Sequence, residues 1–285
     1  MLSLLKKLYP IYRSITGMGN RKTLYILKKE IPKLKINEIK SGTKVFDWVV
    51  PPEWNVKNAY VLDSKNNKII DFKRNNLHLV SYSIPVNKKV DRKELLEHLH
   101  SLQSQPNAIP YVTSYYNDYW GFCVTHKEKK KIQSNKSKNF QIVIDSSFKH
   151  NGSLTFGEFF LKGKTSKEIL ISTYICHPSM ANNELSGPVV ATYLIKYFQK
   201  LSNYYSIRFL FLPETIGSIA YISKNIKKLK KNVIAGYVLT CIGDNKSYSF
   251  LPTKYNNTLS DRAATSAFKN LNLKYKTYSF LERGS

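Results

Sequence analysis

In the second half of the chain, compact apolar runs alternate with stretches that have helical spacing. The runs Glu168–Thr173, Ile207–Leu212 and Val233–Thr240 are typical of strands that are buried on both faces. Between them, Pro188–Phe198 and Ser218–Asn225 have apolar residues at helical intervals. Strands that alternate with helices predict a largely parallel sheet with crossover helices, which is an α/β fold.

Residues 40–137 have a different pattern, in which short β segments are separated by polar turns. The stretch before them is mostly helical. We therefore predict an α/β domain formed by residues 1–39 and 138–285, with an inserted β-rich domain at residues 40–137. The basic segment Lys127–Lys138 is predicted to be a linker, and Gln141–Asp145 a strand that follows it.

The composition fits a globular protein with a sizeable core, because 42% of the 285 residues are hydrophobic and 13% are aromatic. The net charge is +26, but lysine supplies most of it and the lysines are spread along the chain. We interpret this charge as solvated surface and do not expect a nucleic-acid partner, since arginines are few. Three widely spaced cysteines favour a reducing, cytoplasmic location, and no apolar run predicts a membrane span or a membrane partner.

Polar clusters follow the three buried strands: Cys176–Gly187, Pro213–Ser218 and Cys241–Asp244. The carboxyl ends of parallel strands share one edge of a sheet, where ligand crevices form. We therefore expect the metal-binding side chains of these clusters to converge there, namely His177, Asn183, Glu184, Glu214 and Asp244. An imidazole with several carboxylates is a suitable ligand set for zinc.

Each of these residues also has a simpler interpretation. A histidine after a strand is commonly a hydrogen-bonded loop residue. Glu214 is placed where a helix N-terminus favours a carboxylate, and Asp244 follows a glycine, as turn residues often do. The pattern alone therefore leaves a metal site and a set of ordinary loop residues equally open.

Several phrases of the chain resemble bacterial aminopeptidase-like proteins that are associated with surface polysaccharide biosynthesis and belong to the zinc exopeptidase superfamily. The phrases are Phe46–Trp48 with Pro51–Trp54, Ile109–Tyr116 with Trp120–Cys123, and His177–Pro188. The resemblance covers essentially the whole chain. It implies a three-layer α/β/α sheet with a small inserted β-rich domain, and a zinc-dependent hydrolase of peptide or amide bonds.

The resemblance also implies roles for single residues. His177 corresponds to a terminal zinc ligand, Asp244 to a carboxylate ligand and Glu214 to the general base. Asn183 falls where the superfamily has an aspartate that bridges two metal ions, and Glu184 stands beside it. Because the Asn183 amide is neutral and cannot bridge two cations as a carboxylate does, we expect one zinc ion rather than two.

The superfamily has a final histidine ligand well downstream, but no histidine follows His177 here. We therefore expect the chain to be truncated at Ser285, before its fold and metal site are complete, with Tyr275–Leu281 as a strand heading into the sheet. The leading hypothesis is an aminopeptidase-like enzyme, active or impaired by truncation, that acts on a peptide or small amide. The alternatives are an amide hydrolase acting on a surface-polysaccharide precursor and a catalytically degenerate binding protein.

Overall fold

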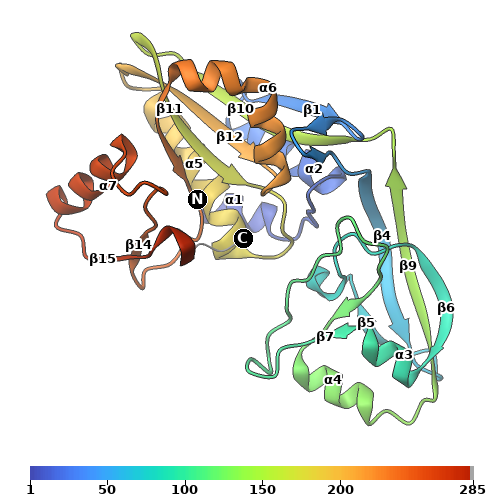
Figure 1. Cartoon of the computed structure of the whole chain (residues 1–285). Coiled ribbons are helices and arrows are strands. Elements are labelled where there is room, and N and C mark those ends of the chain that lie inside the picture. The colour runs from blue at the N-terminus through green and yellow to red at the C-terminus, as the bar shows by residue number, and fades with distance from the viewer. Residues whose placement is uncertain (283–285) are drawn as a thin grey trace.

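The largest sheet has five strands in the order β1-β10-β12-β11-β13 in the computed structural model, which describes residues 1–282 (Figure 1). Its strands are β1 (Lys35–Lys40), β10 (Ser153–Leu161), β11 (Thr165–Tyr174), β12 (Tyr205–Leu212) and β13 (Val233–Val238). β11 is parallel to both β12 and β13, whereas β10 is antiparallel to β12 and to β1. The alternation of strands and helices therefore predicted the parallel part of the sheet correctly.

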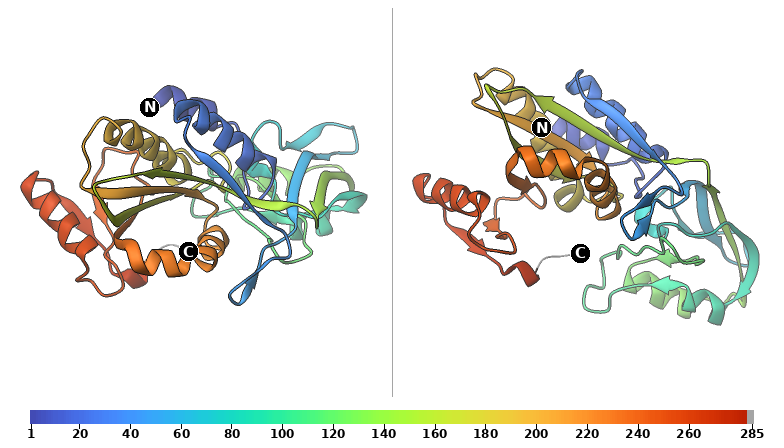
Figure 2. Two further views of the ribbon diagram at one scale, coloured as in Figure 1. Left: turned by 90° about the horizontal axis from the view of Figure 1, so that it is seen from above. Right: turned by 45° about the horizontal axis from the view of Figure 1, so that its top comes forward.

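Helices cover both faces of this sheet, as the two views of Figure 2 show. One face packs against α1 (Leu2–Leu8), α2 (Met18–Glu30) and α5 (Ser186–Phe198), and the other against α6 (Ile216–Asn232). In β12, Phe209 and Phe211 belong to the core on the side of α1, α2 and α5, whereas Leu210 and Leu212 belong to the core on the side of α6. Alternate residues thus fill opposite cores, which explains why this strand is apolar without interruption. The predicted α/β/α layering is confirmed.

A second, antiparallel sheet has the strand order β5-β4-β9-β6. Its strands are β4 (Glu53–Leu62), β5 (Lys68–Asp71), β6 (Val86–Asp91) and β9 (Asn139–Lys149). The predicted strand Gln141–Asp145 lies within β9, which pairs with β4 and β6 and not with the five-stranded sheet. The division of the chain into two domains stays a prediction, with the change of sheet falling between β9 and β10.

Short elements complete the part of the chain that the structure describes. They are β2 (Lys44–Val45), β3 (Trp48–Val49), η1 (Asn76–His78), α3 (Arg92–Glu97), β7 (Leu99–His100), β8 (Phe122–Cys123), α4 (His126–Gln133), the π-helical turn η2 (Ala181–Leu185), β14 (Tyr248–Phe250), α7 (Leu259–Asn270), β15 (Tyr275–Thr277) and η3 (Phe280–Glu282).

Two predictions about these elements are wrong. The predicted linker Lys127–Lys138 contains helix α4, which begins with a capping box: the Thr125 hydroxyl accepts from the backbone N–H of Glu128, and the Glu128 carboxylate accepts from that of Thr125. The predicted strand Tyr275–Leu281 shortens to β15 and pairs with β14 in a separate two-stranded sheet. Ser285, expected above to mark a truncation, lies outside the described residues.

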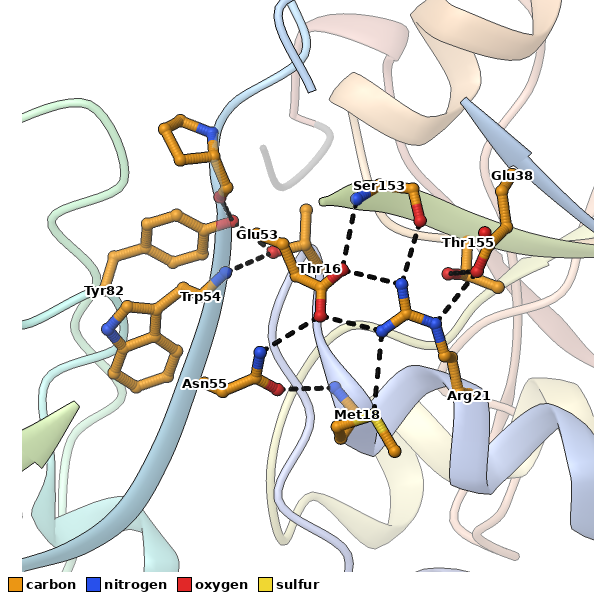
Figure 3. Close-up of polar contacts among 11 residues, drawn as sticks. Thr16, Met18, Arg21, Glu38, Glu53, Trp54, Asn55, Tyr82, Ser153 and Thr155 are labelled. Atoms are coloured by element: carbon orange, nitrogen blue, oxygen red, sulfur yellow. Dashed lines mark hydrogen bonds and ion pairs between the residues drawn. The ribbon is translucent and has the colours of Figure 1, made fainter. Parts of the chain in front are cut away.

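The two larger sheets are joined by a network around Arg21, which Figure 3 shows. Its guanidinium donates two hydrogen bonds to the Glu53 carboxylate, at 2.8 and 2.6 Å, and its Nε donates to Glu38 at 2.9 Å. Ser153 adds a backbone N–H to Glu53 and accepts from Arg21 through its hydroxyl. Because Arg21 is on α2, Glu53 on β4, Glu38 on β1 and Ser153 on β10, one cation connects both sheets.

Among residues 1–282, each helix is too short or too polar to cross a bilayer.

Candidate functional site

The candidate site lies where β11 and β12 end, at the shared carboxyl edge of two parallel strands. Ile175, Cys176 and His177 directly follow β11, and Pro213 and Glu214 directly follow β12. Because the strands are neighbours in register, the two loops meet. The expected convergence of His177 and Glu214 is thus observed.

His177 and Glu214 are in direct contact. The His177 Nε2 atom lies 3.0 Å from Glu214 Oε2. The backbone N–H of Glu214 donates to the Cys176 sulfur at 3.2 Å, so the buried thiol holds the turn that carries the carboxylate. The next residue, Thr215, has a φ of 56°, a left-handed conformation that is strained for a β-branched residue. This turn is therefore built to present Glu214 to His177.

Glu184 completes the cluster from η2. One ligand atom each from Cys176, His177 and Glu184 lies within 4.8 Å of the others, and all three residues are buried. Neither Glu184 oxygen accepts a hydrogen bond from any residue that the structure describes. Burial raises the pKa of Glu184 to about 7, although the nearby Arg13 and His177 oppose the shift. A buried carboxylate with unfilled lone pairs is a group that a cation would satisfy.

Arg13 is the cation nearest to Glu184, with its Nε 3.4 Å from Oε1, and both side chains are fully buried. The guanidinium is held by two backbone carbonyls, since Nε donates to His177 O at 3.1 Å and Nη1 to Leu8 O at 2.8 Å. Burial lowers the pKa of Arg13, and Glu184 partly restores it. Arg13 thus anchors the backbone of His177 and the carboxylate of Glu184 from behind the site.

Aromatic rings surround the imidazole of His177. The ring of Tyr111 lies 4.7 Å from it and that of Tyr174 lies 5.6 Å away, measured between centroids. The hydroxyls of Tyr111 and Tyr115 are 3.2 Å apart, and burial raises the pKa of both phenols. Tyr111 and Tyr115 come from the β-rich segment between α3 and α4, so that segment supplies one wall of the site.

Asp244 lies at the exposed rim of the site. Its Oδ2 accepts a hydrogen bond from Asn182 at 2.8 Å, and its Oδ1 accepts from the backbone N–H of Lys246 at 2.9 Å. These bonds lower the pKa of Asp244. It is outside the cluster of Cys176, His177 and Glu184, and its partner Asn182 belongs to the η2 turn that also carries Glu184.

Asn183 directly follows Asn182, the hydrogen-bond partner of Asp244, but its side chain contacts a different residue. Its amide nitrogen lies 3.6 Å from the Cys241 sulfur, and its buried Oδ1 accepts no hydrogen bond from the described residues. Of the five residues expected to converge, the structure therefore brings His177, Glu184 and Glu214 together, whereas the Asn183 amide contacts Cys241 and Asp244 contacts Asn182 and Lys246. Their proposed ligand roles remain predictions.

The donor set of the cluster fits zinc. Sulfur, imidazole nitrogen and carboxylate oxygen are all zinc ligands in proteins. The contact of 3.0 Å between His177 Nε2 and Glu214 Oε2 places a second carboxylate beside the imidazole that would bind the ion. The unfilled oxygens of Glu184 and Asn183 point to the same conclusion.

Some of the remaining groups of the site could be anticipated from the sequence, and others could not. Cys176 is adjacent to His177 in the sequence, but its hydrogen bond with Glu214 arises because β12 lies beside β11 in the sheet. Arg13 and Tyr111 are 164 and 66 positions from His177 along the chain, and no spacing or strand order in the sequence places them beside it. Only the folded chain shows that they belong to the site.

Structural comparison places the chain in the class of zinc-aminopeptidase folds. A zinc aminopeptidase from Bacillus subtilis is 11% identical, with a TM-score of 0.65 over 96% of this chain and 78% of that one. An M28 peptidase precursor from Shewanella amazonensis is 9% identical, with a TM-score of 0.64 over 99% and 79%. At these identities the likeness establishes a peptidase-like fold.

Much closer similarity is found in Clostridium acetobutylicum. A protein named as a candidate polysaccharide biosynthesis protein with an aminopeptidase-like domain is 47% identical over 283 residues, which are 99% of this chain and 64% of the relative. A crystal structure of a candidate peptidase from that organism is 47% identical, with a TM-score of 0.93 over 99% of this chain and 66% of that one. This chain therefore spans just under two thirds of the length of these relatives.

The family itself follows from a family model that matches residues 2–285. The chain belongs to the family described as domain of unknown function DUF4910. The resemblance to aminopeptidase-like proteins of polysaccharide biosynthesis, which the phrases of the sequence indicated, is confirmed by the named relative.

Proposed function

We propose that this protein is a zinc-dependent, aminopeptidase-like hydrolase of peptide or amide bonds. The observation that carries the proposal is the buried cluster of His177 and Glu184 with Glu214 3.0 Å from the imidazole, at the carboxyl edge of parallel strands. The peptidase-like fold and the names of the solved relatives support it.

His177 and Glu184 are the proposed primary ligands, because both belong to the buried cluster. Asn183 would contribute its unfilled Oδ1. Asp244 would act as a carboxylate ligand after exchanging its hydrogen bond with Asn182. A single zinc ion suits this set, since Asn183 is neutral and Arg13 already places one fixed positive charge beside Glu184. When bound, zinc would polarise the scissile carbonyl and lower the pKa of a water molecule.

Glu214 is the proposed general base. Its carboxylate is partly exposed, with 25% of the side chain accessible, so water and substrate can reach it, whereas Glu184 is closed off. Glu214 would take the proton of the attacking water and pass it to the leaving amine. Tyr111 and Tyr174 restrict the rotation of the His177 ring and limit access of bulk water on two sides.

Substitution of the base tests the proposal. We expect Glu214→Gln to lower kcat for hydrolysis of aminoacyl p-nitroanilides by a factor of about 100 or more, because general-base catalysis contributes that much. Circular dichroism should show an unchanged fold. The matched control is Glu94→Gln, which removes an exposed carboxylate paired with Lys88. Retained activity in Glu214→Gln would show that the base lies elsewhere.

An amide bond in a surface-polysaccharide precursor is the second candidate substrate, favoured by the name of the Clostridium acetobutylicum relative. Release of acetate from N-acetylated sugars, compared with release of amino acids from dipeptides, distinguishes the two. Both activities would be lost together in Glu214→Gln. A wild-type protein that binds no zinc and hydrolyses neither class of substrate would instead favour a binding protein.

A further inference from the structure

Three segments form a continuous surface at the end of the five-stranded sheet that is opposite to the candidate site. They are residues 160–167, 197–205 and 224–232, and we call this surface the basic end. They comprise the turn between β10 and β11, the loop between α5 and β12, and the last part of α6, which lie together at the top of Figure 1. The basic end is thus built at the amino ends of the parallel strands, whereas His177 and Glu214 follow the carboxyl ends.

Contacts between the segments show that they form one surface. The backbone N–H of Lys164 donates to Asn203 O at 3.1 Å, and that of Thr165 donates to Tyr204 O at 3.0 Å. Lys167 Nζ donates to the carbonyl of Lys231 at 3.4 Å, which ties the strand to α6.

The basic end is positively charged without compensation. None of its three segments contains aspartate, glutamate or arginine, and its exposed cations include Lys162, Lys164, Lys167, Lys200, Lys228 and Lys231. Glu158 and Glu168, which flank the first segment in the sequence, are already paired with Arg208, and Glu30 is paired with Lys196. The lysines of this end therefore have no acidic partners of their own among the described residues.

Large apolar side chains are exposed among these lysines. Tyr204 is 64% exposed and Tyr197 is 58% exposed, and the others are Phe160, Leu201 and Tyr205. Single exposed apolar residues are ordinary. Here five of them share one end of the molecule with the lysines, and Lys228 Nζ lies over the Phe160 ring at 5.8 Å. Lysine together with tyrosine and leucine is the composition of surfaces that rest in a membrane interface.

We propose that the basic end binds the surface of a lipid bilayer that contains anionic phospholipid. The lysines supply charge complementarity to the headgroups, and the tyrosine rings and Leu201 enter the headgroup region. A bilayer fits better than a nucleic acid, because the segments lack the arginines that make bidentate phosphate contacts and carry apolar tips instead. Bound in this way, the protein would direct its candidate site away from the membrane.

Vesicle co-sedimentation of the purified chain tests the proposal. We expect binding to vesicles of equal parts phosphatidylcholine and phosphatidylglycerol, and none to pure phosphatidylcholine. The triple variant Lys164→Gln, Lys167→Gln and Lys231→Gln should bind about a hundredfold more weakly, since each lysine at an anionic surface contributes a factor of about five. The matched control, Lys127→Gln with Lys130→Gln and Lys131→Gln on α4, has the same net charge and should bind like the wild type.

A second variant tests the apolar contribution. Tyr204→Ser keeps every charge, and we expect it to leave a smaller bound fraction at high salt, where the lysines are screened. The proposal would be overturned if the two triple variants lost vesicle binding equally. It would also be overturned if the protein bound soluble polyglutamate but not vesicles. Concentration-dependent dimerisation through the basic end with no vesicle binding would overturn it as well. None of these outcomes bears on the hydrolase, whose activity is measured without lipid.

Discussion

Glu184 and Arg13 depend on each other more than other residues of the candidate site do. Both are fully buried, and their atoms lie 3.4 Å apart. The Glu184 oxygens and Arg13 Nη2 have no hydrogen-bond partner among the described residues. A buried charge without hydrogen bonds is costly, and its neighbouring counter-charge is what compensates for it. Removing either one should therefore leave the other uncompensated.

We expect Arg13→Met to lower the free energy of unfolding by about 3 kcal/mol, the usual cost of breaking a buried ion pair from one side. Without Arg13 the pKa of Glu184 rises further above its value of about 7, so the folded protein holds a proton that the unfolded chain releases. Stability of the variant should therefore fall more steeply than that of the wild type as the pH rises. Urea unfolding at several pH values measures this.

The double variant Arg13→Met with Glu184→Gln is the control. It removes both charges and should recover part of the lost stability, with little pH dependence left above neutrality. If the single and double variants were equally unstable at every pH, the loss would come from packing of the arginine and not from an unpaired carboxylate.

At the scale of single elements, partners were harder to predict than the elements themselves. The apolar runs in β11 and β12 and the helical spacing in α5 were sufficient to find those elements. The sequence does not show which sheet β9 joins, because alternation of residues indicates a strand and not its neighbour. Helix α4 was not predicted, because its many lysines are typical of a linker. The pattern of Thr125 and Glu128 is nevertheless that of a capping box, which indicates a helix start.

The junction between the sheets makes a further prediction at this scale. The two hydrogen bonds from Arg21 lower the pKa of Glu53 to about 2, from an ordinary value of 4.5. A depressed carboxyl pKa contributes stability above the ordinary value, and this contribution is lost as the pH falls toward the folded value. Between pH 4.5 and 2, the wild type should therefore lose more stability than Glu53→Gln does.

The exposed pair Lys88–Glu94 provides the comparison for that experiment. Its atoms are 2.6 Å apart, but both side chains are well exposed, so Lys88→Met should change stability by about 0.5 kcal/mol or less. Arg21→Met should cost several times more. Similar losses in both variants would mean that the junction contributes no more than a surface ion pair.

At the scale of the whole molecule, parallel strand order explains why part of the site could be predicted. Loops after neighbouring parallel strands must meet, and so His177 and Glu214 were expected together and are found in contact. Arg13 and Tyr111 could not be found in this way, because their positions depend on how the first helices and the β-rich segment pack against the sheet. Asp244 follows the edge strand β13, and its loop remains at the rim.

Zinc content of the purified protein tests the central proposal most directly. Elemental analysis should find about one zinc ion per chain in the wild type and much less in His177→Ala, because this imidazole is the proposed nitrogen ligand. The control, His150→Ala, alters an exposed histidine in the turn between β9 and β10 and should retain its zinc. Equal zinc in the wild type and His177→Ala would contradict the assignment of the site.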